Sequence, residues 1–473
     1  MNFENLFLEK TNKKPLYQQL YLYLAGRIQS GGVAAGQRLP GKRSAAEQLG
    51  ISVNTVDEAY QMLAAEGYVV AKPRSGFVVA KLEQTIPPPK AAPPVPPAAE
   101  APQRPVEFSF STGDIDPSLF PRKMWNRLLR ETLAGGENLF TRGKSMGEDA
   151  LRLAIAEYLK GYRGVRCTPG QIVVGAGLEV LVGMLARLFA GQPIAVESPG
   201  YGKTSRILQN MGGRVCPVAV DDEGVSVSAL QQSGAQIAYL TPSHQFPTGA
   251  VMPIGRRAEV LHWAAQNNAL IIEDDYDSEF RFDGRPLPSL QGLDEKGHVV
   301  YAGTFSRSLA PGLRAAYLVL PAPLLQSWKQ AYGEYTCTVS RPEQHTLAKF
   351  MQQGHFARSL NRMRGVYRQR RNLLLQALAA ALPAGSYTVQ NAHTGLYFVV
   401  GLPGKNAVQI ANAAPAQGVR VSALRQYVLP GHTAPQKLES RLVLGYGGLA
   451  NGQIEAAVQR LAHLIQTTGG LPL

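Results

Sequence analysis

Seven short apolar segments alternate with longer amphipathic segments between residues 171 and 320, and this alternation constrains the fold most strongly. Segments of four to seven residues that are apolar on both faces are typical of strands in a parallel sheet covered by helices on both sides. The segments are residues 171–174, 193–196, 214–220, 236–240, 269–273, 298–302 and 315–320. We therefore predict an α/β fold with a mostly parallel seven-stranded sheet.

Polar or glycine-rich turns follow five of these predicted strands, at the carboxyl ends where ligands of parallel sheets bind. Small residues at a helix start, hydroxyl groups and a guanidinium are suited to holding a phosphate. The turns contain Ala176 and Gly177; Tyr201; His244; Asp274 and Tyr276; and Thr304, Ser306 and Arg314. Each residue alone could be a helix cap, a packed aromatic or a satisfied histidine, but five such turns at one sheet edge favour a binding site.

These turns resemble those of fold-type I pyridoxal-phosphate (PLP) enzymes. The segment TFSRSLAPGLR, residues 304–314, matches a family pattern in which Thr-x-Ser-Lys or Ser-x-Ser-Lys precedes Pro-Gly-x-Arg. The resemblance implies that Asp274 pairs with the pyridine nitrogen, Tyr276 contacts the ring 3′-oxygen and Tyr201 stacks on the ring, with His244 nearby. It further implies a phosphate site made by Ala176, Gly177, Thr304, Ser306 and Arg314.

Arg307 stands where the family has the lysine that forms the Schiff base with PLP. A guanidinium stays protonated and is not a usable amine nucleophile. Phe246 is a second departure, because it replaces the asparagine of the aminotransferase pattern Asn-Pro-Thr-Gly. We therefore expect any pyridoxal 5′-phosphate or pyridoxamine phosphate to bind without a covalent bond, and we assign no catalytic residue.

The resemblance divides residues 106–473 into a large part, about 155–345, and a small α/β part, about 350–473. Arg441, in RLVLGYG, resembles the family's carboxylate-binding arginine, and Lys203 and Arg206 are candidates for a second acidic group of an effector. The arginine-rich residues 360–378 predict a long helix with a solvated basic face; a phosphate-binding patch is the alternative.

Residues 1–81 form a separate predicted unit. Leu16, Leu20, Leu24 and Ile28 have a helical period, and two shorter helices follow, separated by a tight turn at residues 51–53. Ser52 or Asn54 can cap the third helix. Apolar residues on both sides of a turn at residues 73–76 predict a β-hairpin, so we predict a helix-turn-helix with a wing.

This unit resembles the GntR family, whose pattern LPSxRxLAxxLGVSRxTVxxAYxxLxxEGY is here LPGKRSAAEQLGISVNTVDEAYQMLAAEGY. Val53 replaces an arginine of that pattern, and the wing is a residue short. The resemblance implies that the third helix enters the major groove of double-stranded DNA. The candidate DNA-binding residues are Lys42, Arg43, Ser52, Asn54, Thr55 and Arg74; a protein-binding winged helix is the alternative.

Nine prolines lie between residues 83 and 105 and predict a linker, residues 82–105, in an extended polyproline II conformation. At about 3.1 Å per residue such a linker spans roughly 60–70 Å. That reach would allow the first unit to lie over a partner subunit, although a passive spacer fits the composition equally well.

The net charge of +14 is consistent with an anionic partner such as nucleic acid. Three widely spaced cysteines match no metal or redox pattern, and no apolar segment is long enough to cross a bilayer. Together with the lack of a recognisable signal peptide, these features lead us to expect a cytoplasmic protein without a membrane partner.

A winged helix, a proline-rich linker and an aminotransferase-like unit together resemble MocR-type regulators, a branch of the GntR family. The resemblance implies a domain-swapped homodimer that binds two DNA half-sites and senses a small-molecule effector. One alternative is an active aminotransferase carrying a DNA-binding module, which Arg307 argues against. The other is a cofactor-free regulator whose large unit only dimerises, which the retained Asp274, Tyr276 and Arg314 argue against.

Overall fold

The computed structural model describes residues 3, 6, 8–9, 14–72, 76–81, 105–283, 287–433 and 435–468. Arg74 and nearly all of the predicted linker lie outside the described residues. The chain separates into two compact units, residues 1–101 and 102–473. Each unit is described by itself.

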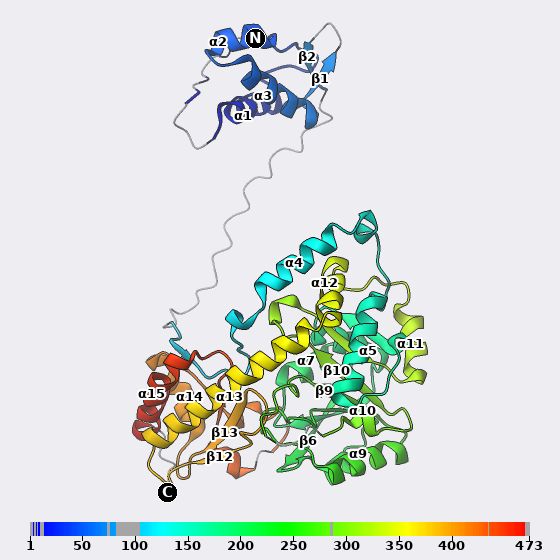
Figure 1. Ribbon diagram of the computed structural model, residues 1–473, viewed down its shortest axis with the longest axis vertical. Helices are drawn as coiled ribbons and strands as arrows, with labels where there is room; N and C mark the ends of the chain where they lie inside the picture. Colours follow the sequence, from blue (N-terminus) through cyan, green and yellow to red (C-terminus); the bar gives the residue numbers. More distant parts are fainter. Residues whose placement is uncertain are drawn as a thin grey trace. The chain divides into compact units, whose positions relative to one another are not determined.

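The first unit has three helices and a hairpin (Figure 1): α1 (Leu16–Gln29), α2 (Lys42–Leu49), α3 (Val53–Ala65), β1 (Val69–Lys72) and β2 (Gly76–Val79). Leu20, Leu24 and Ile28 of α1 are buried, which confirms the predicted helical period. The α2–α3 turn uses Gly50 in the left-handed conformation, φ 62°. Ser52 caps α3, because its hydroxyl accepts a hydrogen bond from the Thr55 N–H at 3.1 Å.

The large part of the second unit contains an eight-stranded sheet in the order β4-β11-β10-β9-β8-β5-β6-β7. The bounds are β4 (Ile172–Gly175), β5 (Pro193–Ser198), β6 (Arg214–Asp221), β7 (Gly224–Val225), β8 (Ile237–Leu240), β9 (Leu270–Asp275), β10 (Val299–Thr304) and β11 (Ala316–Val319). All seven predicted strands are present. The prediction missed β7, which is too short to leave a periodic pattern and pairs antiparallel with β6.

Helices cover both faces of this sheet. They are α4 (Arg122–Leu133), α5 (Asp149–Arg163), α6 (Leu178–Leu188), α7 (Gly202–Asn210), α8 (Val227–Gln232), α9 (Ile254–Gln266), α10 (Leu290–Leu293), α11 (Ala322–Tyr332) and α12 (Arg341–Gln352). On β4, Ile172 and Val174 pack into one buried cluster and Val173 into another. Successive side chains of a strand point to opposite faces, so this strand is apolar throughout because both faces are buried.

The small part combines a four-stranded sheet, order β12-β13-β16-β15, with three helices. Its elements are α13 (His355–Ala381), β12 (Thr388–Gln390), β13 (Tyr397–Gly401), α14 (Ala407–Ala413), β14 (Val419–Arg420), β15 (Ser422–Ala423), β16 (Arg441–Gly445) and α15 (Ile454–Thr467). Short 3-10 turns lie at Pro117–Leu119, Glu137–Phe140, Pro169–Gln171, Pro311–Leu313, Ala414–Gln417, Leu424–Tyr427, Gln436–Leu438 and Asn451–Gln453.

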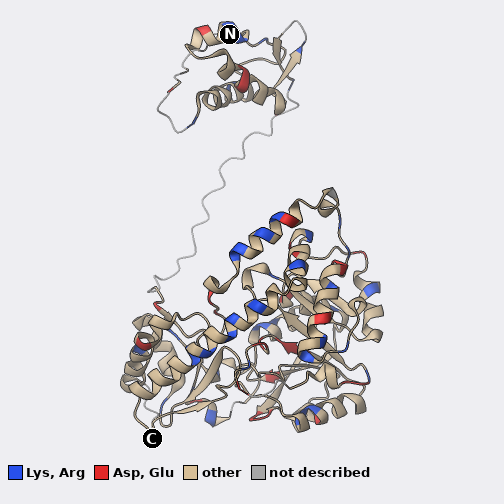
Figure 2. Cartoon of the chain, viewed as in Figure 1, with Lys and Arg blue, Asp and Glu red and all other residues tan. Residues whose placement is uncertain are grey.

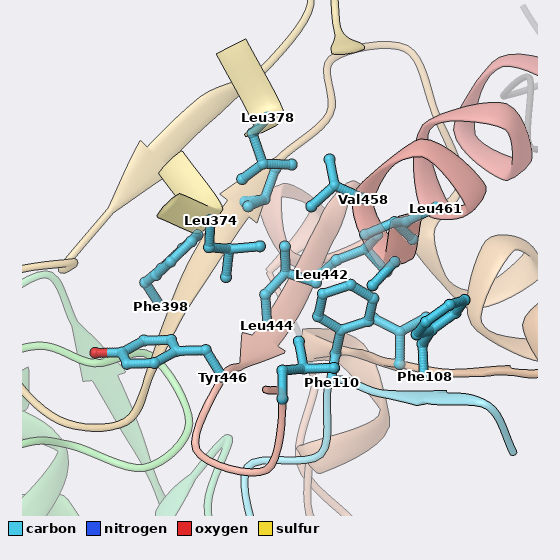
Figure 3. Close-up of a cluster of buried hydrophobic side chains, with 14 of the residues drawn as sticks. Phe108, Phe110, Leu374, Leu378, Phe398, Leu442, Leu444, Tyr446, Val458 and Leu461 are labelled. Carbon is cyan, nitrogen blue, oxygen red and sulfur yellow. The ribbon is translucent and has the colours of Figure 1, made fainter. Parts of the chain in front are cut away.

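The core of the small part also includes residues that precede the large part in sequence. Strand β3 (Phe108–Ser109) pairs in parallel with β14. Phe108 and Phe110 pack against Leu442, Leu444 and Leu461 (Figure 3). The predicted range of the small part, 350–473, is therefore incomplete, because a two-residue strand gives no sequence signal for its distant partner.

The basic helix α13 runs from the large part into the small part (Figures 1 and 2), and its arginines lie between residues 358 and 371. Three of its arginines form hydrogen bonds or ion pairs with other segments. Arg364 donates to the Glu279 carbonyl at 2.6 Å, Arg371 pairs with Asp283 at 2.6 Å, and buried Arg370 donates to the Gly447 carbonyl at 3.0 Å. The prediction of a solvated basic face is wrong for these arginines, which tie α13 to both parts.

Among the described residues, none of the helices combines the length and the apolarity needed to cross a bilayer.

Candidate functional site

A cavity of about 350 Å³ lies at the carboxyl ends of the central strands. The parallel register pairs Leu240 of β8 with Glu273 of β9, and Asp275 of β9 with Gly303 of β10, so these strands end level with one another. The polar residues that follow them therefore meet at one edge. The lining includes Thr112, Glu179, Tyr201, Lys203, Tyr239, Phe246, Asp274, Tyr276, Thr304, Ser306, Arg307 and Arg314.

Asp274, at the end of β9, is buried in the cavity wall. Its Oδ2 accepts a hydrogen bond from the Tyr239 hydroxyl at 2.5 Å, whereas Oδ1 has no partner among the described residues. Burial raises the pKa of this carboxyl to about 7, the charges of Asp275 and Asp277 act in the same direction, and the Tyr239 hydrogen bond opposes them. The cavity therefore presents a buried acceptor that a ligand N–H would complete.

Tyr276 lines the cavity, but His244 does not. The Tyr276 hydroxyl donates to the His244 carbonyl at 2.8 Å and lies 2.9 Å from the Tyr397 hydroxyl. The His244 ring stacks on Tyr397, and its Nδ1 lies 2.8 Å from Asp277 Oδ2. His244 therefore contacts Tyr276 without lining the cavity itself, and its proximity to a bound ring stays a prediction.

At the other end of the cavity, Thr304, Ser306 and Arg314 come together as predicted. The Thr304 Oγ1 donates to the Ser306 Oγ at 3.0 Å. Glu179 was not predicted there, yet its carboxylate pairs with Lys203 Nζ at 2.6 Å and with Arg314 Nη2 at 2.9 Å. The hydrogen bond from Lys203 lowers the pKa of Glu179, and the same bond raises the pKa of Lys203.

Glu179 lies in the first turn of α6, directly after the glycine-rich turn. An acidic residue there also fits an ordinary helix N-terminus, so no local pattern singled it out. Tyr239 was missed for a related reason: inside an apolar strand it looks like a core residue.

Ala176 and Gly177 do not line the cavity, contrary to expectation. The Ala176 N–H donates to the Thr338 hydroxyl at 2.8 Å, so that donor is already engaged. Gly177 has φ 92°, and a Cβ there would lie 2.5 Å from Arg314 Nη2. This glycine therefore makes room for the Arg314 guanidinium, and the turn positions that side chain.

Arg307 lines the cavity at the start of the segment that follows β10. Its Nη1 is buried and has no hydrogen-bond partner within the described part of the chain. Burial raises the pKa of Tyr276 and Tyr397, and the positive charge of Arg307 opposes this effect at both phenols. Tyr276 and Arg307 therefore line the same cavity, and the charge of Arg307 acts on that phenol.

Two aromatic residues complete the wall. The ring of Tyr201, which is 44% exposed, meets the ring of Phe246 edge-to-face with centroids 5.4 Å apart. Phe246 is buried and adds an apolar surface to the cavity wall.

The three predicted effector-binding residues do not share one site. Lys203 lines the cavity, whereas Arg206 is exposed on α7 outside the lining. Arg441, at the start of β16, lines a separate cavity of about 30 Å³ together with Thr248 and Asn391. The expectation that Arg441 and Arg206 face the same ligand as Asp274 is corrected. Neither side chain lines the cavity that contains Asp274.

In the first unit, Arg43 and Asn54 are exposed, as a DNA contact requires. Lys42 pairs with Asp57 of α3 at 2.6 Å, and Ser52 and Thr55 hydrogen-bond to each other at the start of that helix. Helix α3 has no Lys or Arg, so any contact between a basic side chain and a phosphate must come from another segment.

Comparison with known proteins identifies a matching family for each unit. The family model "Bacterial regulatory proteins, gntR family" matches residues 16–79, and "Aminotransferase class I and II" matches residues 110–461. The chain is 38% identical to the uncharacterized HTH-type transcriptional regulator YdeL of Bacillus subtilis, covering 96% of this chain and 98% of YdeL. It is 34% identical to the probable rhizopine catabolism regulatory protein MocR of Rhizobium meliloti, covering 99% and 98%.

The second unit is similar to the crystal structure of LysN, an α-aminoadipate aminotransferase from Thermus thermophilus. The TM-score is 0.67 at 26% identity, covering 76% of this chain and 92% of LysN. That structure is complexed with N-(5′-phosphopyridoxyl)-L-leucine.

Proposed function

This chain belongs to the MocR-type transcriptional regulators, which join a GntR-type DNA-binding unit to an aminotransferase class I and II unit, and we propose that it senses a PLP-related ligand. The ligand would bind in the cavity of the second unit without a covalent bond. Its occupancy would change how a dimer binds DNA.

The observation that carries this proposal is the unpaired, buried Oδ1 of Asp274. A buried acceptor without a donor costs free energy, and a protonated pyridine nitrogen would supply a charge-assisted hydrogen bond there. Asp274 would hold the ring nitrogen, Tyr276 the 3′-oxygen, and Thr304, Ser306 and Arg314 the phosphate. When bound, such a ring acts as an electron sink toward amino groups attached to it.

We infer that the second unit is not an aminotransferase. Arg307 occupies the position of the reactive lysine and supplies no free amine. Lys203 is the one lysine in the cavity lining described above, and its hydrogen bond to Glu179 raises its pKa and keeps it protonated. An ammonium group is not a nucleophile, so neither side chain is suited to forming a covalent bond with the ligand.

We propose further that the regulator is a homodimer whose DNA-binding units cross between subunits and contact two half-sites. Exposed Arg43 would contact phosphates, and Asn54 would lie near base edges. Neutralising a DNA phosphate releases counterions, so Arg43→Ala should weaken binding and reduce its salt dependence. Arg368→Ala, exposed on α13 of the other unit, is the matched control.

The test of the ligand proposal is calorimetric titration of the full-length protein with pyridoxine 5′-phosphate, beside Asp274→Asn. Binding that the variant loses supports the assignment. The same protein should then be incubated with pyridoxal 5′-phosphate, reduced with borohydride and mapped by mass spectrometry. An adduct on Lys203 would overturn non-covalent binding, and an absence of any binding would favour a second unit that only dimerises.

A further inference from the structure

We propose that Arg307 selects the ligand by the charge of one ring substituent, so that the cavity favours a substituent that accepts hydrogen bonds and rejects an amine. This inference rests on the proposed function, because it specifies which PLP-related compounds the same cavity binds. It makes Arg307 a specificity-determining residue rather than the remnant of a lost lysine.

The first observation is the state of the Arg307 guanidinium. It lines the cavity, and its Nη1 is buried with no hydrogen-bond partner in the described chain. No carboxylate of the described residues forms an ion pair with it, whereas the buried guanidinium groups of Arg163 and Arg370 each have one. A guanidinium keeps its proton, so a hydrogen-bond acceptor or an anionic group that enters the cavity would give the buried Nη1 a partner.

The second observation is the chemistry of its surroundings. Burial raises the pKa of three nearby phenols, those of Tyr276, Tyr367 and Tyr397, and the positive charge of Arg307 opposes this effect at each of them. The Tyr276 hydroxyl is already committed to the His244 carbonyl. These phenols remain neutral, so they cannot compensate the guanidinium as a carboxylate would.

The third observation is that, within the described chain, the cavity contains one unpaired acceptor atom as well as the unpaired donor of Arg307. Asp274 Oδ1 is an acceptor without a donor, and Arg307 Nη1 is a donor without an acceptor, among the residues that the structure describes. Both residues line the same cavity. A ring with an N–H at one position and an acceptor at another satisfies both atoms, whereas a ring with an ammonium substituent adds a second positive charge beside Arg307.

The experiment compares four ligands that share the ring and phosphate and differ in one substituent. They are 4-pyridoxic acid 5′-phosphate (carboxylate), pyridoxal 5′-phosphate (aldehyde), pyridoxine 5′-phosphate (hydroxyl) and pyridoxamine 5′-phosphate (ammonium). Calorimetric titration of the full-length protein should give affinities that fall in this order. The carboxylate should bind at least about tenfold more tightly than the ammonium, since tenfold corresponds to about 1.4 kcal/mol.

Two variants at Arg307 test whether its charge causes the preference, and a third variant, at Arg368, is the control. Arg307→Gln keeps a polar side chain without charge and should bring the four affinities together. Arg307→Lys keeps a positive charge and should retain the preference for carboxylate over ammonium, which is measured with these two unreactive ligands. Arg368→Gln removes one positive charge from an exposed site on α13 and should leave the order unchanged.

The outcomes separate this inference from the function on which it rests. If none of the four ligands binds, the proposed function fails and this inference fails with it. If all four bind equally, if the amine binds most tightly, or if Arg307→Gln keeps the full preference, the ligand site stands and the role of Arg307 is refuted.

Discussion

The two ends of the cavity are built on different physical principles. At the end that we propose for the ligand ring (the ring end), Asp274 and Tyr239 are 8% and 4% exposed and hydrogen-bonded to each other. At the end that we propose for the phosphate (the phosphate end), the side chains of Glu179, Lys203 and Arg314 are 43%, 54% and 47% exposed. Burial makes an unmatched hydrogen bond costly, whereas solvent and salt screen exposed ion pairs. Selectivity should therefore come from the ring end, and the phosphate end should add affinity that depends on salt.

The largest expected effect is at the ring end. Asp274→Ala should weaken binding of pyridoxine 5′-phosphate about 10- to 100-fold, because a hydrogen bond to a charged group contributes about 1.5–3 kcal/mol. Calorimetric titration measures the loss, and Asp222→Ala, at an exposed site, is the matched control. An affinity that does not change in Asp274→Ala would show that the ring binds elsewhere.

The second expected effect is on the pH dependence of stability. The pKa of Asp274 is raised from 3.8 to about 7 in the folded protein, so between these values the folded state binds more protons than the unfolded state. Stability from this group is fully present below pH 3.8 and is lost as the pH rises through about 7.

Asp274→Asn should therefore reduce the loss of stability over this pH range, by on the order of 4 kcal/mol in unfolding free energy, because each pKa unit corresponds to about 1.36 kcal/mol. Thermal unfolding followed by circular dichroism at several pH values measures it. A slope should remain, because burial also raises the pKa of Glu197 to about 7. Identical pH profiles for the wild type and the variant would contradict the raised pKa of Asp274.

A smaller effect is expected at the phosphate end. Arg314→Gln should weaken binding of the same ligand about tenfold at low salt, by removing one charge-assisted contact. The loss should shrink as salt rises, because the Debye length falls to about 8 Å at physiological ionic strength. A loss that is independent of salt would mean that Arg314 is shielded from solvent, and the contrast between the two ends would fail.

The smallest expected effect is a gain. Glu179→Gln removes the carboxylate that neutralises Lys203 and Arg314, and should tighten binding of pyridoxine 5′-phosphate about two- to fourfold, the range of exposed ion pairs. The gain should disappear at high salt. Weaker binding in the variant would show that Glu179 holds the two cations in place rather than competing with the ligand.

Much of this organisation followed from local sequence patterns. The apolar segments became strands within two residues of their predicted bounds, because a strand buried on both faces tolerates few polar residues. Asp274, Tyr276, Thr304 and Ser306 could be predicted as one group because they lie at or just beyond the carboxyl ends of β9 and β10, and Arg314 lies in the segment that follows β10. Their positions depend on topology, which the alternation of strands and helices already indicates.

Predictions failed where a side chain's role depends on segments far away in sequence. Arg370 and Arg371 looked like surface charge, but they reach Gly447 and Asp283. His244 was expected near the ring; it does not line the cavity, and its Nδ1 lies 2.8 Å from Asp277 Oδ2.

The sequence by itself determined the two units and the order of the strands along the chain, because each is written in neighbouring residues. The tertiary structure decided which charges are paired. It brought Glu179 between Lys203 and Arg314 and left Arg307 without a carboxylate among the described residues, because a charge is balanced by whatever lies within a few ångströms, regardless of separation along the chain.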